Sequence, residues 1–288
     1  MYTITAVTGH VGGATARALI AAGADVRAVV RNPDTGAAWA ERGAEVAVAD
    51  FTDQAALTAA LSGSDGAFVM LPTIATASDA EHREMADSIA VAVADSAVPH
   101  VVMLSSVGAD LPEGTGPIRW LHHLEHRLNA TGVIVTAIRS PHFQEKVETV
   151  LPAAISDGVY PVFGDLADIG IPMVATCDVG VAAAEFLMSP PAASQVIDLD
   201  APTYSEADVA RQLGTVLGRD LHVVPIPRAD WLDTLTATGM PTTMAAELVE
   251  LFDAGHRGDL RPRSGHLHRC TTPLDDTLCH LVESYKER

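Results

Sequence analysis

Basic residues are scarce in this sequence. Eighteen lysines and arginines stand against 37 aspartates and glutamates, which gives a formal net charge of −19 at pH 7. A surface with this excess of negative charge repels the phosphate backbone of nucleic acids and the headgroups of anionic membranes. We therefore expect neither a nucleic-acid partner nor a membrane partner.

Cysteines and long apolar runs are also rare. The three cysteines, Cys177, Cys270 and Cys279, are far apart and form no Cys-x-x-Cys pair, which argues against a disulfide framework and a structural zinc site. No apolar run reaches the ~20 residues that span a bilayer, and no basic segment followed by an apolar core opens the chain. These absences predict a cytoplasmic protein.

Aromatic residues make up only 5% of the chain, whereas hydrophobic residues make up 48%. The interior must therefore be built mainly from Ala, Val, Leu and Ile, the residues that fill buried parallel strands and the helices covering them. With 288 residues, the chain is long enough for one large α/β domain or for a core domain with a smaller lobe.

A glycine-containing turn follows the first β-branched run. The run covers residues 2–7, the turn covers residues 8–13, and an alanine-rich helix is expected from Ala14 to Ala22. This arrangement aims helix N–H groups at a phosphate, where the helix dipole also favours negative charge. A Gly-x-x-Gly-x-x-Gly pattern laid here has Ala6 in its first position, which a turn tolerates if Ala6 keeps a negative φ. A turn that binds nothing is the alternative.

Arg31 ends the second predicted strand, which runs from residue 24. In a doubly wound sheet this position lies beside the glycine turn. An acidic residue there would accept hydrogen bonds from the ribose of NAD, whereas an arginine supplies a planar cation for the 2′-phosphate of NADP. Arg31 therefore favours NADP(H), with NAD(H) as the alternative cofactor and a solvated surface arginine as the alternative reading.

Strands and helices continue to alternate through the first half of the chain. Further strands are expected at residues 45–50, 66–71, 100–105 and 133–139, with helices at 37–42, 54–61, 78–96 and 117–129. This order predicts a parallel doubly wound sheet with ligands at the carboxyl ends of its strands. Beyond about residue 150 the alternation weakens, although strands are expected near 169–174 and 196–199 and helices at 179–188, at 205–217 and over most of the tail from residue 240.

The assembled pattern resembles the NmrA-like family of atypical short-chain dehydrogenases/reductases. The resemblance rests on Thr5–Gly13, on Val29–Asp34, and on the stretches VMLSSVGA (102–109), GTGPIRWLHHLEHRL (114–128), TAIRSPHFQE (136–145), IPMVATCD (171–178) and VVPIPRADWLDTLTATG (223–239). It implies an α/β Rossmann-like NAD(P)-binding domain over residues 1–149. It also implies a mainly substrate-binding lobe over residues 150–288, with elements that return to the sheet.

The resemblance also implies where ligands bind. We expect the cofactor to be held by Thr8, Gly9, His10, Val11, Arg31, Asp50, Phe51, Leu71, Pro72 and Ser105, the last beside Ser106. Val107 and Phe143 are expected to contact the substrate, and Phe143 has the ring to stack on a planar molecule. A core aromatic is the alternative for Phe143, and backbone-bonding hydroxyls are the alternative for the serines.

The usual proton donor of short-chain reductases, Tyr-x-x-x-Lys, is missing. Counting back from Glu125, which matches the family's helix glutamate, the two positions fall on Pro117 and Leu121. Neither residue donates a proton. The candidates that remain are His122 and His123 on the same helix and His142 after the next strand, because the unperturbed pKa of histidine is ~6.5. Partly exposed structural histidines are the alternative.

Three functions of different classes follow. The first is an NADPH-dependent oxidoreductase, monomeric or homodimeric, that reduces a planar carbonyl such as a quinone or an aromatic polyketide ketone. The second is a non-catalytic NADP-responsive regulatory protein, which the lost catalytic pair motivates. The third is a zinc metallohydrolase, because His122, Glu125 and His126 spell His-x-x-Glu-His. No third zinc ligand is identifiable in the sequence, so the first function is preferred and no metal ligand is assigned.

Overall fold

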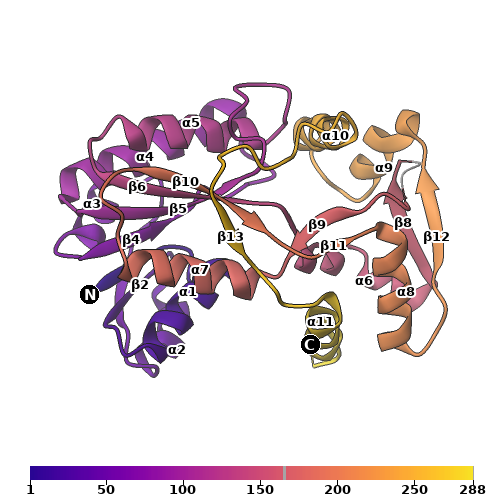
Figure 1. Ribbon diagram of the computed structural model, residues 1–288, viewed down its shortest axis with the longest axis horizontal. Helices are drawn as coiled ribbons and strands as arrows, with labels where there is room; N and C mark the ends of the chain where they lie inside the picture. Colours follow the sequence, from indigo (N-terminus) through magenta and orange to yellow (C-terminus); the bar gives the residue numbers. More distant parts are fainter. Residues whose placement is uncertain (165–166, 288) are drawn as a thin grey trace.

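The computed structural model describes residues 1–164 and 167–287 (Figure 1). Its largest feature is an eight-stranded sheet in the order β13-β10-β6-β5-β4-β1-β2-β3, in which every neighbouring pair is parallel. These strands are β1 (Tyr2–Ile4), β2 (Val26–Val30), β3 (Glu45–Val48), β4 (Gly66–Val69), β5 (His100–Ser106), β6 (Ile134–Ser140), β10 (Gln195–Asp200) and β13 (Leu267–Arg269). The predicted parallel doubly wound sheet is confirmed.

Helices cover both faces of this sheet (Figure 1). One face carries α3 (Gln54–Leu61), α4 (Asp79–Ser96) and α5 (Ile118–Asn129), and the other carries α1 (His10–Ala21), α2 (Ala37–Ala40) and α7 (Thr176–Met188). Double coverage explains why central strands read as unbroken apolar runs, since all four residues of β4 are buried. The 3₁₀ segment η1 (Pro33–Gly36) leads from β2 into α2.

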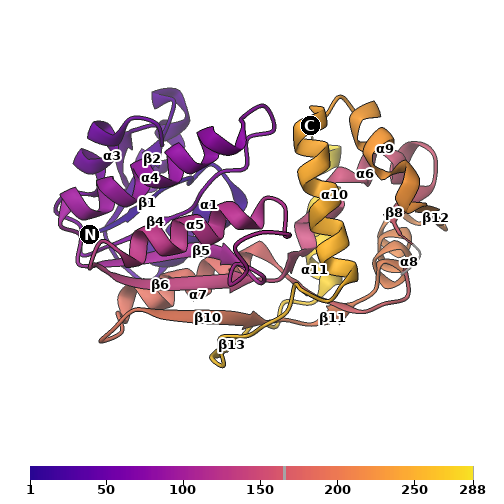
Figure 2. The same ribbon diagram turned by 90° about the horizontal axis from the view of Figure 1, so that it is seen from above.

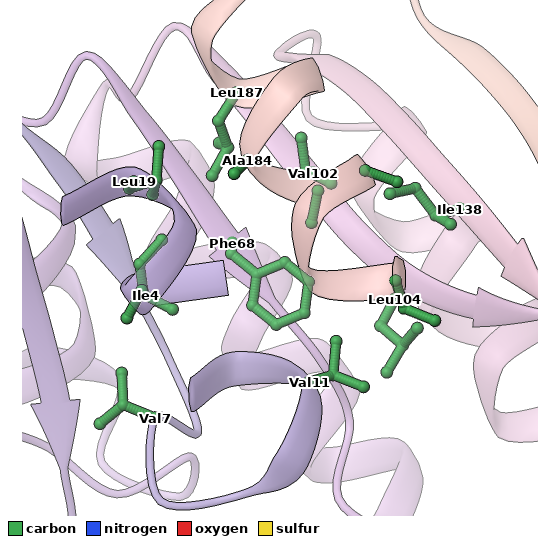
Figure 3. Close-up of a cluster of buried hydrophobic side chains, with 14 of the residues drawn as sticks. Ile4, Val7, Val11, Leu19, Phe68, Val102, Leu104, Ile138, Ala184 and Leu187 are labelled. Atoms are coloured by element: carbon green, nitrogen blue, oxygen red, sulfur yellow. The ribbon is translucent and has the colours of Figure 1, made fainter. Parts of the chain in front are cut away.

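Phe68 lies at the centre of the core between the sheet and helices α1 and α7 (Figure 3). It is fully buried, as are Ile4 and Leu19, which pack in the same cluster. The two helices approach each other closely at Gly180, where an added Cβ atom would lie only 2.7 Å from the backbone nitrogen of Thr15. A helix from the second half of the chain is thereby an integral part of the first half's core.

The remaining elements form a lobe beyond the carboxyl ends of the strands (Figure 2). It contains a three-stranded sheet, β11-β9-β7, and a parallel pair, β12-β8. Its strands are β7 (His142–Phe143), β8 (Val159–Phe163), β9 (Ile171–Val174), β11 (Thr203–Tyr204) and β12 (His222–Ile226). Its helical segments are η2 (Gln144–Thr149), α6 (Leu151–Ser156), α8 (Glu206–Leu217), η3 (Arg228–Asp230), α9 (Trp231–Ala237), α10 (Thr242–His256) and α11 (Leu274–Lys286).

The lobe has its own apolar core and also packs against the sheet domain. Leu151, Leu213 and Leu278 are buried together in that core. Helix α10 also reaches back, since Met244 packs in the core between the sheet and helices α4 and α5.

No helix in the described part of the chain is both long enough and apolar enough to cross a membrane.

Candidate active site

The turn between β1 and α1 is built on a left-handed residue. Ala6 has a φ of 52°, and its carbonyl accepts the N–H of Gly9 at 3.0 Å. The condition of a negative φ at Ala6 is therefore not met, and the turn instead closes this bond with Ala6 in the left-handed region. Gly12 faces the same carbonyl, and a Cβ atom there would also lie 2.6 Å from the Thr5 oxygen. The turn therefore requires glycine at position 12. At position 6 it holds an alanine in a backbone conformation that glycine adopts at lower energy.

The amino terminus of α1 offers donors for an anion. The helix begins at His10, earlier than the predicted Ala14. Its cap residue, Gly9, has no side chain with which to accept hydrogen bonds from the first N–H groups of the helix. Thr8, Gly9 and His10 are exposed, whereas Val11 is buried in the core. An uncapped helix start beside a close backbone turn fits the pyrophosphate of a dinucleotide.

His10 also reaches toward the second half of the chain. Its Nε2 atom lies 3.3 Å from Oε2 of Glu148 in η2. The His10 side chain is about half exposed (55%) in this contact. His10, which is predicted to contact the cofactor, therefore links the glycine turn to η2 of the lobe.

Arg31 follows β2, the strand beside β1, and is exposed. Within the described part of the chain its guanidinium makes no hydrogen bond or ion pair. It lies close enough to Asp50 to influence that carboxyl, whose pKa is lowered mainly by bonds from the Thr52 hydroxyl and N–H and also by the charge of Arg31. Asp50 and the half-buried Phe51 follow β3, so the predicted adenosine-side residues do meet along one edge of the sheet.

Leu71 and Pro72 follow β4, which lies on the other side of β1. The loop beyond them is fixed by His82, whose Nε2 accepts the Ile74 N–H at 3.1 Å and whose Nδ1 donates to the Ser78 carbonyl at 2.8 Å. The His82 ring also stacks on Trp120, with 3.6 Å between ring centroids. Both ring nitrogens of His82 are engaged, so the ring ties the loop after Pro72 to the start of α4.

Ser105 is buried, and its hydroxyl donates to Oε1 of Glu125 at 2.5 Å. Arg139 donates to both oxygens of the same carboxylate, at 3.0 and 2.7 Å. The Ser105 hydroxyl is therefore committed to a buried ion pair beneath the predicted site. Val107, which follows it, is buried, and its N–H donates to the Ser140 carbonyl at 3.1 Å.

His142 and Phe143 follow β6 at the carboxyl edge of the sheet. His142 is exposed at the protein surface, and desolvation by the neighbouring protein, together with the positive charge of Lys146, lowers its pKa from 6.5 to about 4. His142 is therefore neutral near pH 7. Phe143 is half-buried and packs against the core around Phe68.

The other two candidate histidines face different surroundings on α5. The Nδ1 atom of His122 lies 2.8 Å from the Ala109 carbonyl, in the loop after β5. His123 faces α4, where its Nε2 lies 2.8 Å from Oδ1 of Asp87. Of the two, only His122 contacts a segment that leaves the carboxyl edge of the sheet.

The metallohydrolase reading of this helix is not supported. Glu125 points into the core and pairs with Arg139, so it is unable to activate a water beside His122 and His126. The described residues also contain no group of three potential ligands arranged to hold a metal ion.

The positions counted for tyrosine and lysine lie at the start of the same helix: Pro117 is its cap residue, and Leu121 packs in the core it shares with α4.

Three charged residues of this region went unrecognised in the sequence. Arg139, Asp110 and Arg263 form a chain of charges, with Arg139 Nη1 at 3.7 Å from Asp110 Oδ1 and Arg263 Nη1 at 2.8 Å from Asp110 Oδ2. Arg139 was detectable in the sequence, because it interrupts the apolar run of β6. Arg263 had no local signal, since it reaches this place only through the tertiary fold.

Comparison with known proteins settles the family. Residues 2–260 match the model of the NmrA-like family. The chain belongs to the NmrA-like family. The resemblance deduced from the sequence motifs is confirmed over nearly the whole chain.

Several members and structures resemble the chain in full length. It is 26% identical to Quinone oxidoreductase 2 of Escherichia coli (strain K12) over 291 aligned positions, which cover 98% of each chain. It is 26% identical to NAD(P)H azoreductase of Xenophilus azovorans, covering 88% of this chain and 86% of the relative. The crystal structure of the E. coli NADPH-dependent quinone oxidoreductase with NADPH superposes with a TM-score of 0.82 at 25% identity, over 98% of this chain and 100% of the other.

Proposed function

We propose that this protein is an NADPH-dependent reductase of planar, electron-poor carbonyl compounds such as quinones or aromatic polyketide ketones. The observation that carries the proposal is the combination of an uncapped α1 amino terminus with an exposed Arg31 that follows the adjacent strand β2 and makes no hydrogen bond or ion pair with the described residues. Relatives named as quinone oxidoreductase and NAD(P)H azoreductase support the reaction class.

Each end of the cofactor has its own residues in this proposal. The N–H groups at the start of α1 bind the pyrophosphate, and Arg31 binds the 2′-phosphate. Phe51, Leu71 and Pro72 line the adenosine side. Val107 and Phe143 border the nicotinamide and the substrate. The bound cofactor supplies the hydride.

Few side chains of this protein are available to supply the proton that the reduced substrate needs. Reduction of an isolated ketone produces a strongly basic alkoxide, which needs an acid, whereas reduction of a quinone produces a phenolate whose conjugate acid has a pKa of ~10 and takes its proton from water. Pro117 and Leu121 stand at the counted positions of the usual donor pair, and His142 is neutral at working pH. The substrate class is therefore proposed to be one that needs no acidic side chain. His142 then acts as a neutral hydrogen-bond donor to the substrate carbonyl.

Two measurements test the proposal together. Thermal shift with NADP and NAD reports whether the cofactor binds and which form is preferred. Steady-state oxidation of NADPH with a panel of quinones, azo dyes and aryl ketones reports whether hydride is transferred. We expect stabilisation by NADP and turnover with quinones. Tight NADP binding without turnover of any acceptor would contradict the enzyme and favour the NADP-responsive regulator.

A further inference from the structure

The segment between α10 and β13 touches the loop after β5 in two places. We call residues 257–266 the connector and residues 107–111 the β5 loop. Leu260 of the connector lies against Gly108, where an added Cβ atom would come within 2.8 Å of its Cδ2 atom. Arg263 of the connector donates through Nη1 to Oδ2 of Asp110 at 2.8 Å. A segment far along the chain thus supports the loop that leaves the carboxyl end of β5.

The connector is itself fixed to the sheet at Arg263. The backbone N–H groups of Arg263 and Ser264 both donate to Oδ2 of Asp198, at 2.8 and 2.7 Å. Asp198 is buried in β10, with 1% of its surface exposed. The Arg263 side chain therefore extends toward Asp110 from a backbone that has little freedom to move.

Asp110 depends on Arg263 for its hydrogen bond. Its Oδ1 atom is buried without a hydrogen-bond partner in the described residues, and the nearest Arg139 nitrogen is 3.7 Å from it. Arg139 is already committed to Glu125 at 2.7 Å. Removal of the Arg263 side chain would leave Asp110 with a distant cation and no donor, which favours movement of the loop toward water.

We propose that Arg263 is a positioning residue that acts through Asp110 to hold the β5 loop, and with it Val107, at the substrate side of the active site. This inference rests on the proposed function, since it assigns a role at the same site. Arg263 is anchored on β10, whereas the proposed pyrophosphate, 2′-phosphate and adenosine contacts follow β1, β2, β3 and β4, which lie farther along the strand order of the sheet. Its loss should therefore affect substrate positioning rather than cofactor binding.

The test compares Arg263→Met with Arg261→Met. Arg261 lies in the same connector, is exposed, and its side chain makes no hydrogen bond or ion pair in the described residues, so the control removes an equal charge without touching Asp110. With NADPH and 2-methyl-1,4-naphthoquinone, we expect kcat of Arg263→Met to fall by about ten- to a hundredfold. KM for NADPH should stay within about twofold of the starting protein. Arg263→Lys should recover much of the loss, because one donor is enough for the single bond to Asp110.

Two further readouts separate positioning from general damage. Asp110→Ala, which removes the acceptor, should reproduce the kcat loss, and the double variant should be no worse than either single variant, because both substitutions remove the same bond. Hydrogen exchange of the amides of residues 107–111 should accelerate in Arg263→Met but not in Arg261→Met. An unchanged kcat, equal effects of the two arginine variants, or unchanged exchange would overturn the proposal. If the starting protein reduces no acceptor, the proposed function fails, and the exchange comparison alone then decides whether Arg263 holds the loop.

Discussion

Ser105 and Arg139 stand opposite each other in the parallel strands β5 and β6, and both donate to the same oxygen of Glu125, at 2.5 and 3.0 Å. Asp198 is in turn the register partner of Arg139 in β10, so a row of polar residues crosses three strands at their carboxyl ends. In parallel strands register partners face the same side of the sheet, here the side covered by α5. Burial opposes the charge of Arg139, but the bonds and charge of Glu125 outweigh it and raise the pKa of the guanidinium.

Replacement of Glu125 by Gln should destabilise the protein strongly. The variant keeps the shape of the side chain but removes the carboxylate to which the buried Arg139 donates both of its short bonds, which costs about 3–5 kcal/mol in the free energy of unfolding. Urea denaturation measures the change. Arg127→Gln on the same helix breaks an exposed ion pair with Asp87, in which both side chains are 46% exposed, and should cost less than about 1 kcal/mol. Equal effects of the two variants would contradict a buried, energetically important pair.

Arg31→Ala should reduce the preference for NADP(H) over NAD(H) by about ten- to a hundredfold, because it removes a charge-assisted bond to the 2′-phosphate. Calorimetric titration with both cofactors measures the ratio. Arg42→Ala is the matched control, since Arg42 is also an exposed arginine, stacked 5.7 Å from the Trp39 ring, and should leave the ratio unchanged. Equal affinities of the starting protein for the two cofactors would show that Arg31 does not select between them.

Ala6→Gly should stabilise the fold and leave NADP binding unchanged or tighter. A non-glycine residue in the left-handed region carries roughly 1–2 kcal/mol of strain, which glycine avoids. The greater flexibility of glycine in the unfolded chain offsets part of this gain in stability. Ala97, at the end of α4, has a φ of 55° and offers the same backbone change away from the site. Both variants should raise Tm, and any tightening of NADP binding should be confined to Ala6→Gly. Weaker NADP binding by a folded Ala6→Gly variant would mean that the methyl group helps to shape the site.

The rate of quinone reduction should be nearly flat from pH 6 to 9. The pKa of His142 is lowered to about 4, so this ring is neutral throughout the range and no activity is lost as pH rises through it. A histidine that donated the proton would instead give a rate that falls above its pKa, and its removal would cost roughly 10²–10⁴-fold. His122→Ala, His123→Ala and His142→Ala, measured across this range, test the expectation. A loss above about a hundredfold in one variant with intact cofactor binding would identify that histidine as the acid.

Local sequence patterns were enough to predict the elements of the sheet domain. The β-branched runs and their glycine, asparagine and proline boundaries placed β1 to β6 within a few residues, and Asp53 and Ser78 cap α3 and α4 as such residues usually do. The NmrA-like motifs then supplied the family. These signals are local, so they are visible without tertiary contacts.

The ion-pair row and the turn conformation required the tertiary structure. Whether Arg139 meets Glu125 depends on the register between β6 and the helix packed over it, and Arg263 reaches Asp110 from more than a hundred residues away in sequence. The left-handed Ala6 is set by closure of the bond to Gly9 and is hidden by a residue type that rarely adopts it. Long-range pairing and local strain are the two things that a residue pattern does not encode.

The return of β10 to the sheet affects how the chain is made. β6 pairs with β5 on one side and with β10 on the other, and β10 is separated from β6 by all the segments from β7 to α7. During synthesis at about 5–20 residues per second, the free edge of β6 is exposed for on the order of seconds before β10 reaches it. An uncovered strand edge recruits other strands. The nascent sheet domain is therefore open to misassociation at β6 as well as at the outer strand β3, and a chaperone that shields the β6 edge would act in the interval before β10 emerges.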